Sequence, residues 1–506
     1  MIKVWVVMLS FILTGLLFGS SVRAIDKIQE ARIAETAREI VSNEEWIIPH
    51  YNGEVRLQKP PLTYWTTSLS FKIFSVNEFS ARIPSLIFSL MTALLLFVWL
   101  KREVNLRAAV NAVIVLMSTF IGMRYFRSAE ADTTLAFFIC LAGFSGFYFI
   151  EAYRRLHVWI FMLSLGLGFL TKGPAAIAIP LLTIVIYSLL MKKIARCKSL
   201  LNPIGIAILL FSAFAWYVWI FINMPDIAQG FFSKQVDETF VTGNHKQPIY
   251  WYLIHFVDFF APWSLLALPA VIWYKNNQSF PKIIFFALIW LLVVFVLLTI
   301  TVNKQTQYAL LLLPPIVIVL SYYLEQAVGI FYKVNRMFFI TLFLSGIFLT
   351  AFVAYRHGIY RIFELPNILV WILLCVLPVF LMKILKIEEY FNKPVLYAGV
   401  TMTFIYLFSE QYIANDLEKS DIKQLMISTQ TDDHFYQLSP GNGAVSFYAA
   451  RDIRPLTYKQ IKTMADSDQD FRLVAKKKAN FEFNNINFIV EKEFGDWAIW
   501  HFGKNK

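Results

Sequence analysis

Apolar runs long enough to cross a bilayer recur along this chain, from its start to about residue 413. A transmembrane helix needs roughly 20 mostly apolar residues to span about 30 Å of hydrocarbon. The runs that flank residues 171–174 are short and could instead form one kinked hairpin, so the count is open by one or two. Thirteen spans are predicted, at residues 4–22, 81–100, 108–124, 133–150, 158–171, 174–191, 203–222, 251–273, 283–301, 309–323, 337–354, 367–382 and 394–413.

A polar first loop, at about residues 24–80, separates the first two spans and is far longer than the other early loops. Apolar residues at helical spacing within 28–42 predict an amphipathic helix along the membrane interface, with Glu35, Arg38 and Glu39 on its solvated face. A turn-rich stretch follows through residue 53. Residues 60 and 61, both proline, open a second helix. A long loop of this kind is rarely a mere connector.

The sequence becomes polar again from about residue 415, with short alternating runs and turn signals. Residues 445–448, 488–490 and 497–502 are predicted as strands and 459–466 as a short helix. The predicted fold class is therefore a polytopic α-helical membrane protein: a transmembrane domain at 1–413 and a small soluble α/β domain at 414–506. We find no cluster typical of catalysis in the second domain.

Composition supports this fold class, because hydrophobic residues make up 58% and aromatic residues 17% of the 506 residues. A soluble domain holds about 45–50% apolar residues. Lysine and arginine in short loops collect on the cytoplasmic side, which places the first loop and the C-terminal segment outside. The net charge of +12 then follows from this bias, without a nucleic-acid partner. Sixteen residues carry the cytoplasmic bias: Lys101, Arg102, Arg107, Arg154, Arg155, Lys192, Lys193, Arg196, Lys198, Lys275, Lys282, Lys333, Arg336, Lys383, Lys386 and Lys393.

Residues 1–24 also have the features of a signal peptide, although the apolar run favours a retained anchor. The three cysteines indicate no disulfide framework. A phosphate-cradling glycine loop, paired zinc-binding cysteines and a helical His-Glu-x-x-His motif are all missing from the sequence. A nucleotide-linked donor therefore has no support, and a donor that arrives through the membrane suits the chain better.

Ionisable residues from separate loops gather on the predicted outer side. Asp132 begins the fourth span, Lys172 lies in a Thr-Lys-Gly-Pro turn, and His245, Lys246 and Lys304 belong to two further outer loops. Charges at membrane depth are costly and mark functional sites by default. Asp132 has a simpler interpretation as a cap of the fourth span, and the charges of the first loop have one as ordinary surface pairs.

Four ordered motifs resemble the GT-C glycosyltransferases that depend on polyprenyl-phosphate sugars. They are residues 30–39 (EARIAETARE), 46–49 (WIIP), 57–65 (LQKPPLTYW) and 170–174 (LTKGP). Within this family the chain is most similar to the bacterial aminoarabinose transferases of lipid A and their relatives, cousins of the protein O-mannosyltransferases.

The resemblance implies transfer of a sugar from undecaprenyl or another polyprenyl phosphate, with inversion, at the outer face of a bacterial inner membrane. The acceptor would be lipid A, a related envelope molecule or a protein. Polyprenyl phosphate leaves, so fixed cations must stabilise its charge. Lys59 matches the phosphate-contacting lysine of the family and Arg32 the arginine of the first-loop motif. Four further cations are candidates for this role: His245, Lys246, Lys172 and Lys304.

Two departures from the family pattern concern the base and a metal. Gln29 stands where family members commonly have an aspartate, and Gln58 where they often have a glutamate. Both glutamines are still candidates for binding the substrate or its phosphate. An amide cannot act as a base, and the loss of both carboxylates argues against a divalent metal. Glu30, Asp26 or Asp132 could serve as the base instead. An acceptor that is itself a phosphate would need little help from a base.

Three other functions stay open. Protein O-glycosylation would make a carboxylate base more important, because its acceptor is a hydroxyl. A lipid or sugar transporter would also have many spans, but related halves or broken helices are expected of it, and we see no internal repeat. A non-catalytic relative is the third, with Gln29 as the mark of lost activity.

Overall fold

The computed structural model describes most of the chain and groups it into two compact units. The first, here the helical unit, comprises Met1–Ser20, Gln58–Leu62 and Ser85–Ile413; the second, here the loop unit, comprises Ser21–Leu57, Thr63–Pro84 and Ala414–Lys506. The described residues are 3, 6–9, 12, 16, 23–25, 27–229, 246–277, 279–338, 340–341, 344, 380–381, 383–385, 392–408, 420–429, 434–467, 469–477 and 488–502.

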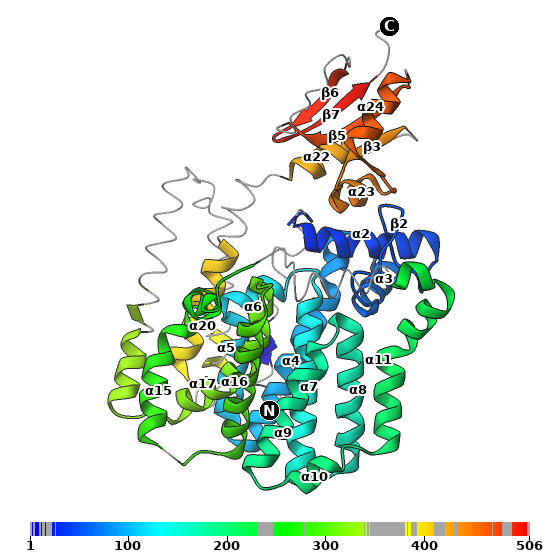
Figure 1. Cartoon of the computed structure of the whole chain (residues 1–506). Helices are drawn as coiled ribbons and strands as arrows, with labels where there is room; N and C mark the ends of the chain where they lie inside the picture. The colour runs from blue at the N-terminus through cyan, green and yellow to red at the C-terminus, as the bar shows by residue number, and fades with distance from the viewer. Residues whose placement is uncertain are drawn as a thin grey trace. The chain divides into compact units, whose positions relative to one another are not determined.

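Apolar helices make up the helical unit, and several of them run side by side (Figure 1). Among the described residues, five stretches are long and apolar enough to cross a membrane: Glu78–Glu103, Ala131–Ala152, Pro203–Asn223, Lys282–Ile300 and Thr306–Gln326. The helices of this unit are α4 (Glu78–Glu103, whose residues before Ser85 belong to the loop unit), α5 (Leu106–Ser118), α6 (Phe120–Tyr125), α7 (Ala131–Ala152), α8 (Arg155–Lys172), α9 (Ala175–Leu190), α10 (Ile194–Lys198), α11 (Pro203–Asn223), α13 (Trp251–Ile254), α14 (Phe256–Phe259), η2 (Trp263–Leu266), α15 (Ala267–Asn276), α16 (Lys282–Ile300), η3 (Thr306–Leu312), α17 (Leu313–Gln326) and α20 (Lys393–Phe408).

Local sequence sets the ends of these helices. The side chain of Asn202 accepts hydrogen bonds from two backbone N–H groups at the start of α11, and Pro203 occupies its first turn. Gly173 follows α8 with a φ of 89°, a conformation that favours glycine. The runs before and after this glycine are therefore two helices, α8 and α9.

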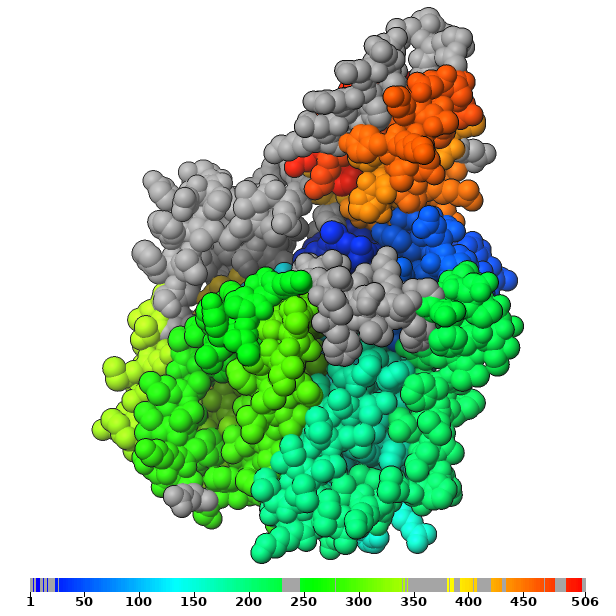
Figure 2. Space-filling view, in the orientation of Figure 1, coloured from blue at the N-terminus to red at the C-terminus, as the bar shows by residue number. Residues whose placement is uncertain are grey.

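The outer surface of the helical unit is apolar, as contact with lipid requires. Phe211 of α11 is 78% exposed and Ile222 of the same helix 73% exposed. Figure 2 shows this unit as a space-filling surface, with the green residues of α11 lying at its edge. Water would penalise such exposure, whereas hydrocarbon does not.

The span predicted at residues 251–273 is broken, and this prediction was wrong. The structure has three short helical segments at 251–266, followed by α15. Pro262 explains the interruption between α14 and η2, since proline supplies no backbone N–H and its ring clashes with the preceding turn. The predicted spans at 4–22, 337–354 and 367–382 lie largely outside the described residues, as does the end of the span at 394–413.

First-loop elements of the loop unit follow the predicted order. Helix α2 (Ile28–Asn43) leads into a hairpin of β1 (His50–Tyr51) and β2 (Glu54–Val55), and α3 (Leu62–Phe74) comes next. The hairpin turns at Asn52 and Gly53, which both have positive φ. An Asn-Gly pair is the preferred sequence for such a turn.

C-terminal residues of the loop unit form a five-stranded sheet in the order β4-β3-β5-β7-β6. Strand β3 pairs in parallel with β4 and β5, whereas β7 pairs antiparallel with β5 and β6. The elements are α22 (Asp421–Ile427), β3 (Phe435–Leu438), α23 (Gly443–Ala449), β4 (Pro455–Leu456), α24 (Tyr458–Asp466), β5 (Phe471–Lys476), β6 (Phe488–Phe494) and β7 (Trp497–Phe502). Leu456, Ile461, Phe471, Leu473 and Phe502 form its core.

The helix predicted at 459–466 and the strands predicted at 488–490 and 497–502 are confirmed. The strand predicted at 445–448 is wrong, because these residues belong to helix α23. The side chain of Asn442 caps that helix by accepting from the Ala444 N–H. The boundary of a separate domain at residue 414 stays a prediction, and the structure groups residues 414–506 with first-loop segments.

Candidate active site

Glu30, the predicted base of the first loop, is fully buried in the first turn of α2 and held by two arginines. Arg82 donates from Nε to Oε1 at 2.8 Å and from Nη2 to Oε2 at 3.2 Å. Arg23 adds longer contacts at 3.3 and 3.4 Å. Arg82 also donates to the backbone carbonyls of residues 23 and 24. A carboxylate in a bidentate pair with a buried guanidinium has its charge and both oxygens engaged.

Gln29 and Arg32 lie on the same helix and are partly exposed. Asp26, the other first-loop candidate for the base, lies outside the described residues. Gln58 is exposed and Lys59 partly buried, in the short stretch between β2 and α3 that belongs to the helical unit. The roles of these residues stay predictions from the motif.

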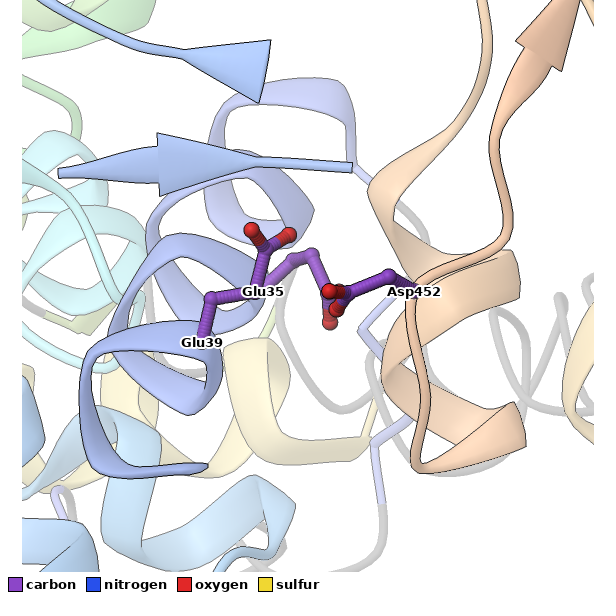
Figure 3. A group of neighbouring side chains, drawn as sticks. All are labelled: Glu35, Glu39 and Asp452. Carbon is purple, nitrogen blue, oxygen red and sulfur yellow. The ribbon is translucent and has the colours of Figure 1, made fainter. Parts of the chain in front are cut away.

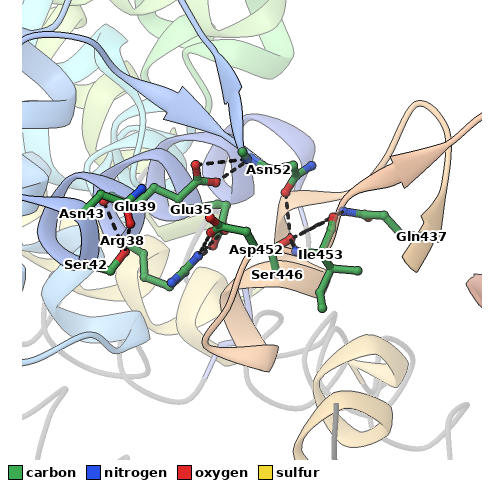
Figure 4. A network of polar contacts seen from close by, with 11 residues as sticks. Glu35, Arg38, Glu39, Ser42, Asn43, Asn52, Gln437, Ser446, Asp452 and Ile453 are labelled. Atoms are coloured by element: carbon green, nitrogen blue, oxygen red, sulfur yellow. Dashed lines mark hydrogen bonds and ion pairs between the residues drawn. The ribbon is translucent and has the colours of Figure 1, made fainter. Parts of the chain in front are cut away.

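A buried network on α2 corrects our interpretation of its charged face. Glu35, Arg38 and Glu39 are only 0%, 6% and 1% exposed, so they are not a solvated face. Arg38 donates to Glu35 from Nε at 2.9 Å and from Nη2 at 2.8 Å, and also to Asp452, which follows α23. Figure 3 shows the three carboxylates and Figure 4 the bonds that join them to their neighbours. The physical reason is that the loop unit, not water, covers this side of α2.

The hairpin completes this network. Both carboxylate oxygens of Glu39 accept backbone N–H groups, from Asn52 at 2.5 Å and from Gly53 at 3.2 Å (Figure 4). Burial, and then the charges of Glu35 and Asp452, raise the pKa of Glu39 to about 8. Burial likewise raises the pKa of Glu35, against the opposing effect of Arg38. Glu39 therefore keeps its proton near neutral pH.

The same three carboxylates lie close enough together to be considered as metal ligands. Oxygens of Glu35, Glu39 and Asp452 lie within 4.8 Å of one another. However, the Arg38 guanidinium already bonds Glu35 and Asp452, and the hairpin N–H groups already bond Glu39. A divalent cation prefers several oxygen ligands and no cation beside them. The cluster therefore does not fit a metal.

In the helical unit, the structure brings two predicted residues into direct contact. Lys172 at the end of α8 donates from Nζ to Oδ1 of Asp132 at 2.5 Å. Asp132 is buried in the first turn of α7, whose N-cap position is held by Glu130. The alternative of a capping role for Asp132 is therefore wrong. This ion pair joins the ends of two spans that meet on the predicted outer side.

Tyr308 of η3 is a neighbour that the sequence analysis missed. Its ring lies under the Lys172 ammonium, with Nζ 4.5 Å from the ring centroid. A cation over a tyrosine face gains about 0.5–2 kcal/mol. Its position in the sequence could have suggested this contact, because Tyr308 ends the predicted outer loop that carries Lys304.

Lys304 and Lys246 lie on adjoining backbone of the helical unit. Lys304 is buried and donates to the Thr301 carbonyl. Lys246 is exposed and forms an isolated β-bridge with Asn303, one residue before Lys304. His245 lies outside the described residues. The structure thus places two predicted outer-loop lysines close along the backbone, and their binding roles stay predictions.

Comparison with known proteins agrees with the motifs. Residues 58–219 match the model of the family described as dolichyl-phosphate-mannose-protein mannosyltransferase. The chain is 27% identical over 333 residues to an undecaprenyl phosphate-alpha-4-amino-4-deoxy-L-arabinose arabinosyl transferase of Wigglesworthia glossinidia brevipalpis, covering 64% of this chain and 59% of that protein. It is 29% identical over 343 residues to an uncharacterized protein of Aquifex aeolicus, covering 66% and 76%.

The fold extends the likeness to nearly the whole chain. The crystal structure of ArnT from Cupriavidus metallidurans bound to undecaprenyl phosphate superposes with a TM-score of 0.80, at 17% identity, over 99% of this chain and 97% of that one. The sequence matches span about three fifths of the arabinosyl transferases. By its ordered motifs, the family match of residues 58–219 and its fold, the chain is similar to the GT-C glycosyltransferases that use polyprenyl-phosphate sugars.

Proposed function

We propose that the protein is an integral membrane glycosyltransferase that moves one sugar from undecaprenyl phosphate, or a similar carrier, to an anionic phosphate on lipid A or a related envelope lipid. Its donor is supported by the relatives named as arabinosyl transferases of undecaprenyl phosphate aminoarabinose and by the ArnT structure with undecaprenyl phosphate. We place it in a bacterial inner membrane with the reaction on the outer face.

We choose a phosphate acceptor because the structure engages both of the candidate bases that it describes, Glu30 and Asp132, in ion pairs. Glu30 is ion-paired with Arg82, and Asp132 with Lys172. Gln29 holds an amide where the family commonly has an aspartate. A hydroxyl acceptor needs a base to take its proton as it attacks, whereas a phosphate oxygen is already anionic at neutral pH. This chain therefore suits a phosphate acceptor.

The bond changes are simple. An acceptor phosphate oxygen forms a bond to the anomeric carbon, and the bond between that carbon and the carrier phosphate oxygen breaks with inversion. The electron pair leaves on the carrier phosphate. Lys59 and Arg32, the residues that match the family motif, would stabilise that charge by charge-assisted hydrogen bonds.

Mass spectrometry of lipid A and envelope proteins, from cells with and without the protein, tests this function. We expect one sugar to appear on a lipid phosphate. A sugar on protein instead would favour the mannosyltransferase-like alternative, which the matched family description supports. Unchanged lipids and proteins would contradict both transferase functions.

Lys59→Ala should abolish transfer while the protein still inserts into the membrane, because the leaving phosphate loses its cation. Lys101→Ala is the matched control, since Lys101 is an exposed lysine at the far end of α4. Transfer at the normal rate by the Lys59 variant would remove Lys59 from the site.

A further inference from the structure

A short C-terminal segment, residues 442–453, contacts every first-loop element of the loop unit. Asp452 bonds Arg38 of α2, and the hydroxyl of Ser446 donates to Oδ1 of Asn52 in the hairpin at 2.8 Å. The ring of Phe447 packs against Phe71 of α3, with centroids 6.3 Å apart. The segment therefore touches α2, the hairpin and α3 together.

The same segment also reaches the chain on either side of those elements. The hydroxyl of Tyr448 accepts the Ile25 N–H at 2.8 Å, just before α2, and contacts Glu78 at 3.2 Å, at the start of α4. Lys423 of α22 adds an ion pair with Glu78. Contacts at both ends and in the middle restrain the first loop as a whole.

Gly443 sets how closely the segment approaches α2. A Cβ atom at this position would lie 2.8 Å from the Ala31 carbonyl oxygen and 2.7 Å from the Tyr51 ring. No side chain fits at these distances without moving the backbone of α2. Helix α23 thus begins directly on the turn of α2 that carries the motif residues Glu30 and Arg32.

Asp452 is the charged anchor of this contact. Its carboxylate faces the Arg38 guanidinium, which is also held by Glu35 from the preceding turn. Arg38 lies six residues after Arg32, or about 9 Å along a helix that rises 1.5 Å per residue. An uninterrupted helix transmits a fixed position over that distance, because its backbone hydrogen bonds resist bending.

We propose that Asp452 is a positioning residue of the transferase, which acts through Arg38 to fix the motif-bearing turn of α2 for the reaction. This inference rests on the proposed function. A displacement of about 1 Å in a group that aligns the reacting atoms can cost up to about 100-fold in rate. Asp452 itself does not touch substrate in this proposal.

The test compares Asp452→Asn with Glu491→Gln in the full-length protein reconstituted in vesicles. Glu491 forms an ion pair with Arg472 within the sheet, at 2.7 Å, and makes a matched control with the same loss of one charge. The first readout is hydrogen exchange of peptides from residues 28–43. The second is kcat for transfer from undecaprenyl phosphate that carries the sugar found by the mass spectrometry proposed above, measured beside the Kd for undecaprenyl phosphate.

We expect Asp452→Asn to accelerate exchange across α2 and to lower kcat about tenfold, while the Kd for undecaprenyl phosphate changes by less than about threefold. Asp452→Glu, which restores the charge, should recover most of the rate. Glu491→Gln should match the wild type. If the asparagine variant does not accumulate, Ser446→Ala, which removes the bond of the same segment to Asn52, provides the same two readouts in milder form.

Three outcomes would overturn the inference: an asparagine variant as active as the control, a loss of rate without faster exchange in α2, or no rescue by glutamate. Failure of the proposed function looks different, because the wild-type protein itself would then transfer no sugar. A uniform loss of folded protein in all variants, the control included, would also count against a specific role for Asp452.

Discussion

Each unit contains a cluster of ion pairs, and the two clusters differ in how many groups they connect. In the helical unit, Asp132 and Lys172 form a single pair beside one ring, that of Tyr308. In the loop unit, Arg38 holds Glu35 and Asp452 while Glu39 is bonded by the hairpin backbone. The pair in the helical unit links two helix ends, whereas the cluster in the loop unit links segments that are more than 400 residues apart in sequence.

The difference shows what hydropathy reports in a membrane protein. Apolar runs identify the segments that lipid covers, and they identified the helices that carry Asp132 and Lys172. They say nothing about charges that another part of the protein covers, so the polar face of α2 was assigned to water. A buried charge is tolerated where its partners are complete, and the loop unit supplies those partners from a distant segment.

The largest expected effect comes from removing the hub of the denser cluster. Arg38→Leu leaves Glu35 and Asp452 without their shared guanidinium, and breaking a buried pair in this way costs about 3–5 kcal/mol. Hydrogen exchange in α2 should accelerate accordingly, with that of α7 unchanged. Equal protection of α2 in the variant would show that the network contributes nothing to its stability.

The single pair should be weaker and should show measurable coupling. Asp132→Asn and Lys172→Gln should each lower the denaturation temperature of the solubilised protein, with losses of about 1.5–3 kcal/mol, the usual range for hydrogen bonds to charged groups. The double variant should lose clearly less than the sum. Strict additivity would mean that the two side chains do not stabilise one another.

The two clusters should also differ in how their contribution to stability depends on pH. The pKa of Glu39 is about 8 in the folded unit, above its ordinary value of 4.5, so the folded form binds the proton more tightly. The stabilisation is complete below about pH 4.5 and is lost as the pH rises through 8, by at most about 1.4 kcal/mol per pH unit. Exchange in α2, corrected for intrinsic rates, should report this loss.

Glu39→Gln provides the control for the pH experiment, because an amide does not titrate. The groups that face Glu39 are Glu35, Arg38, Asp452 and the hairpin N–H donors. A slope that persists in the glutamine variant would assign the dependence to one of these neighbours instead.

The smallest effect is expected at Tyr308. Tyr308→Leu removes the ring beneath Lys172 and should cost about 1 kcal/mol, while Tyr308→Phe keeps the ring and should be nearly neutral. Thermal denaturation of the two variants side by side measures this. A larger loss in the phenylalanine variant would show that the hydroxyl, not the ring, matters.

Particular elements show how far the sequence predicts this fold. The spans at 81–100, 133–150 and 203–222 correspond to α4, α7 and α11, because long apolar runs have one stable solution in hydrocarbon. Helix α2 was predicted from its periodicity, but the partners of Arg38 were not, since nothing local to residues 28–42 points to Asp452. Residues 445–448 have the composition of a strand, but they form part of helix α23, whose start is capped by Asn442.

Some features of the candidate site could likewise be predicted from the sequence, and others required the structure. The prediction that Asp132 and Lys172 lie on one side of the membrane came from their positions beside apolar runs, whereas their direct contact required the structure. Gln29 and Gln58 were visible in the sequence as departures from the family pattern. The engagement of Glu30 by Arg82 depends on how the start of α4 packs against α2, which no pattern of single residues encodes.

The 414-residue separation between Arg38 and Asp452 has a consequence for biosynthesis. At about 5–20 residues per second, the ribosome makes Asp452 roughly 20–80 s after Arg38. Throughout that interval Glu35 and Arg38 have emerged but their C-terminal partner has not. A nascent chain of this protein therefore carries an incomplete first loop until residue 452 has been made, which leaves that loop open to chaperones and proteases during this interval.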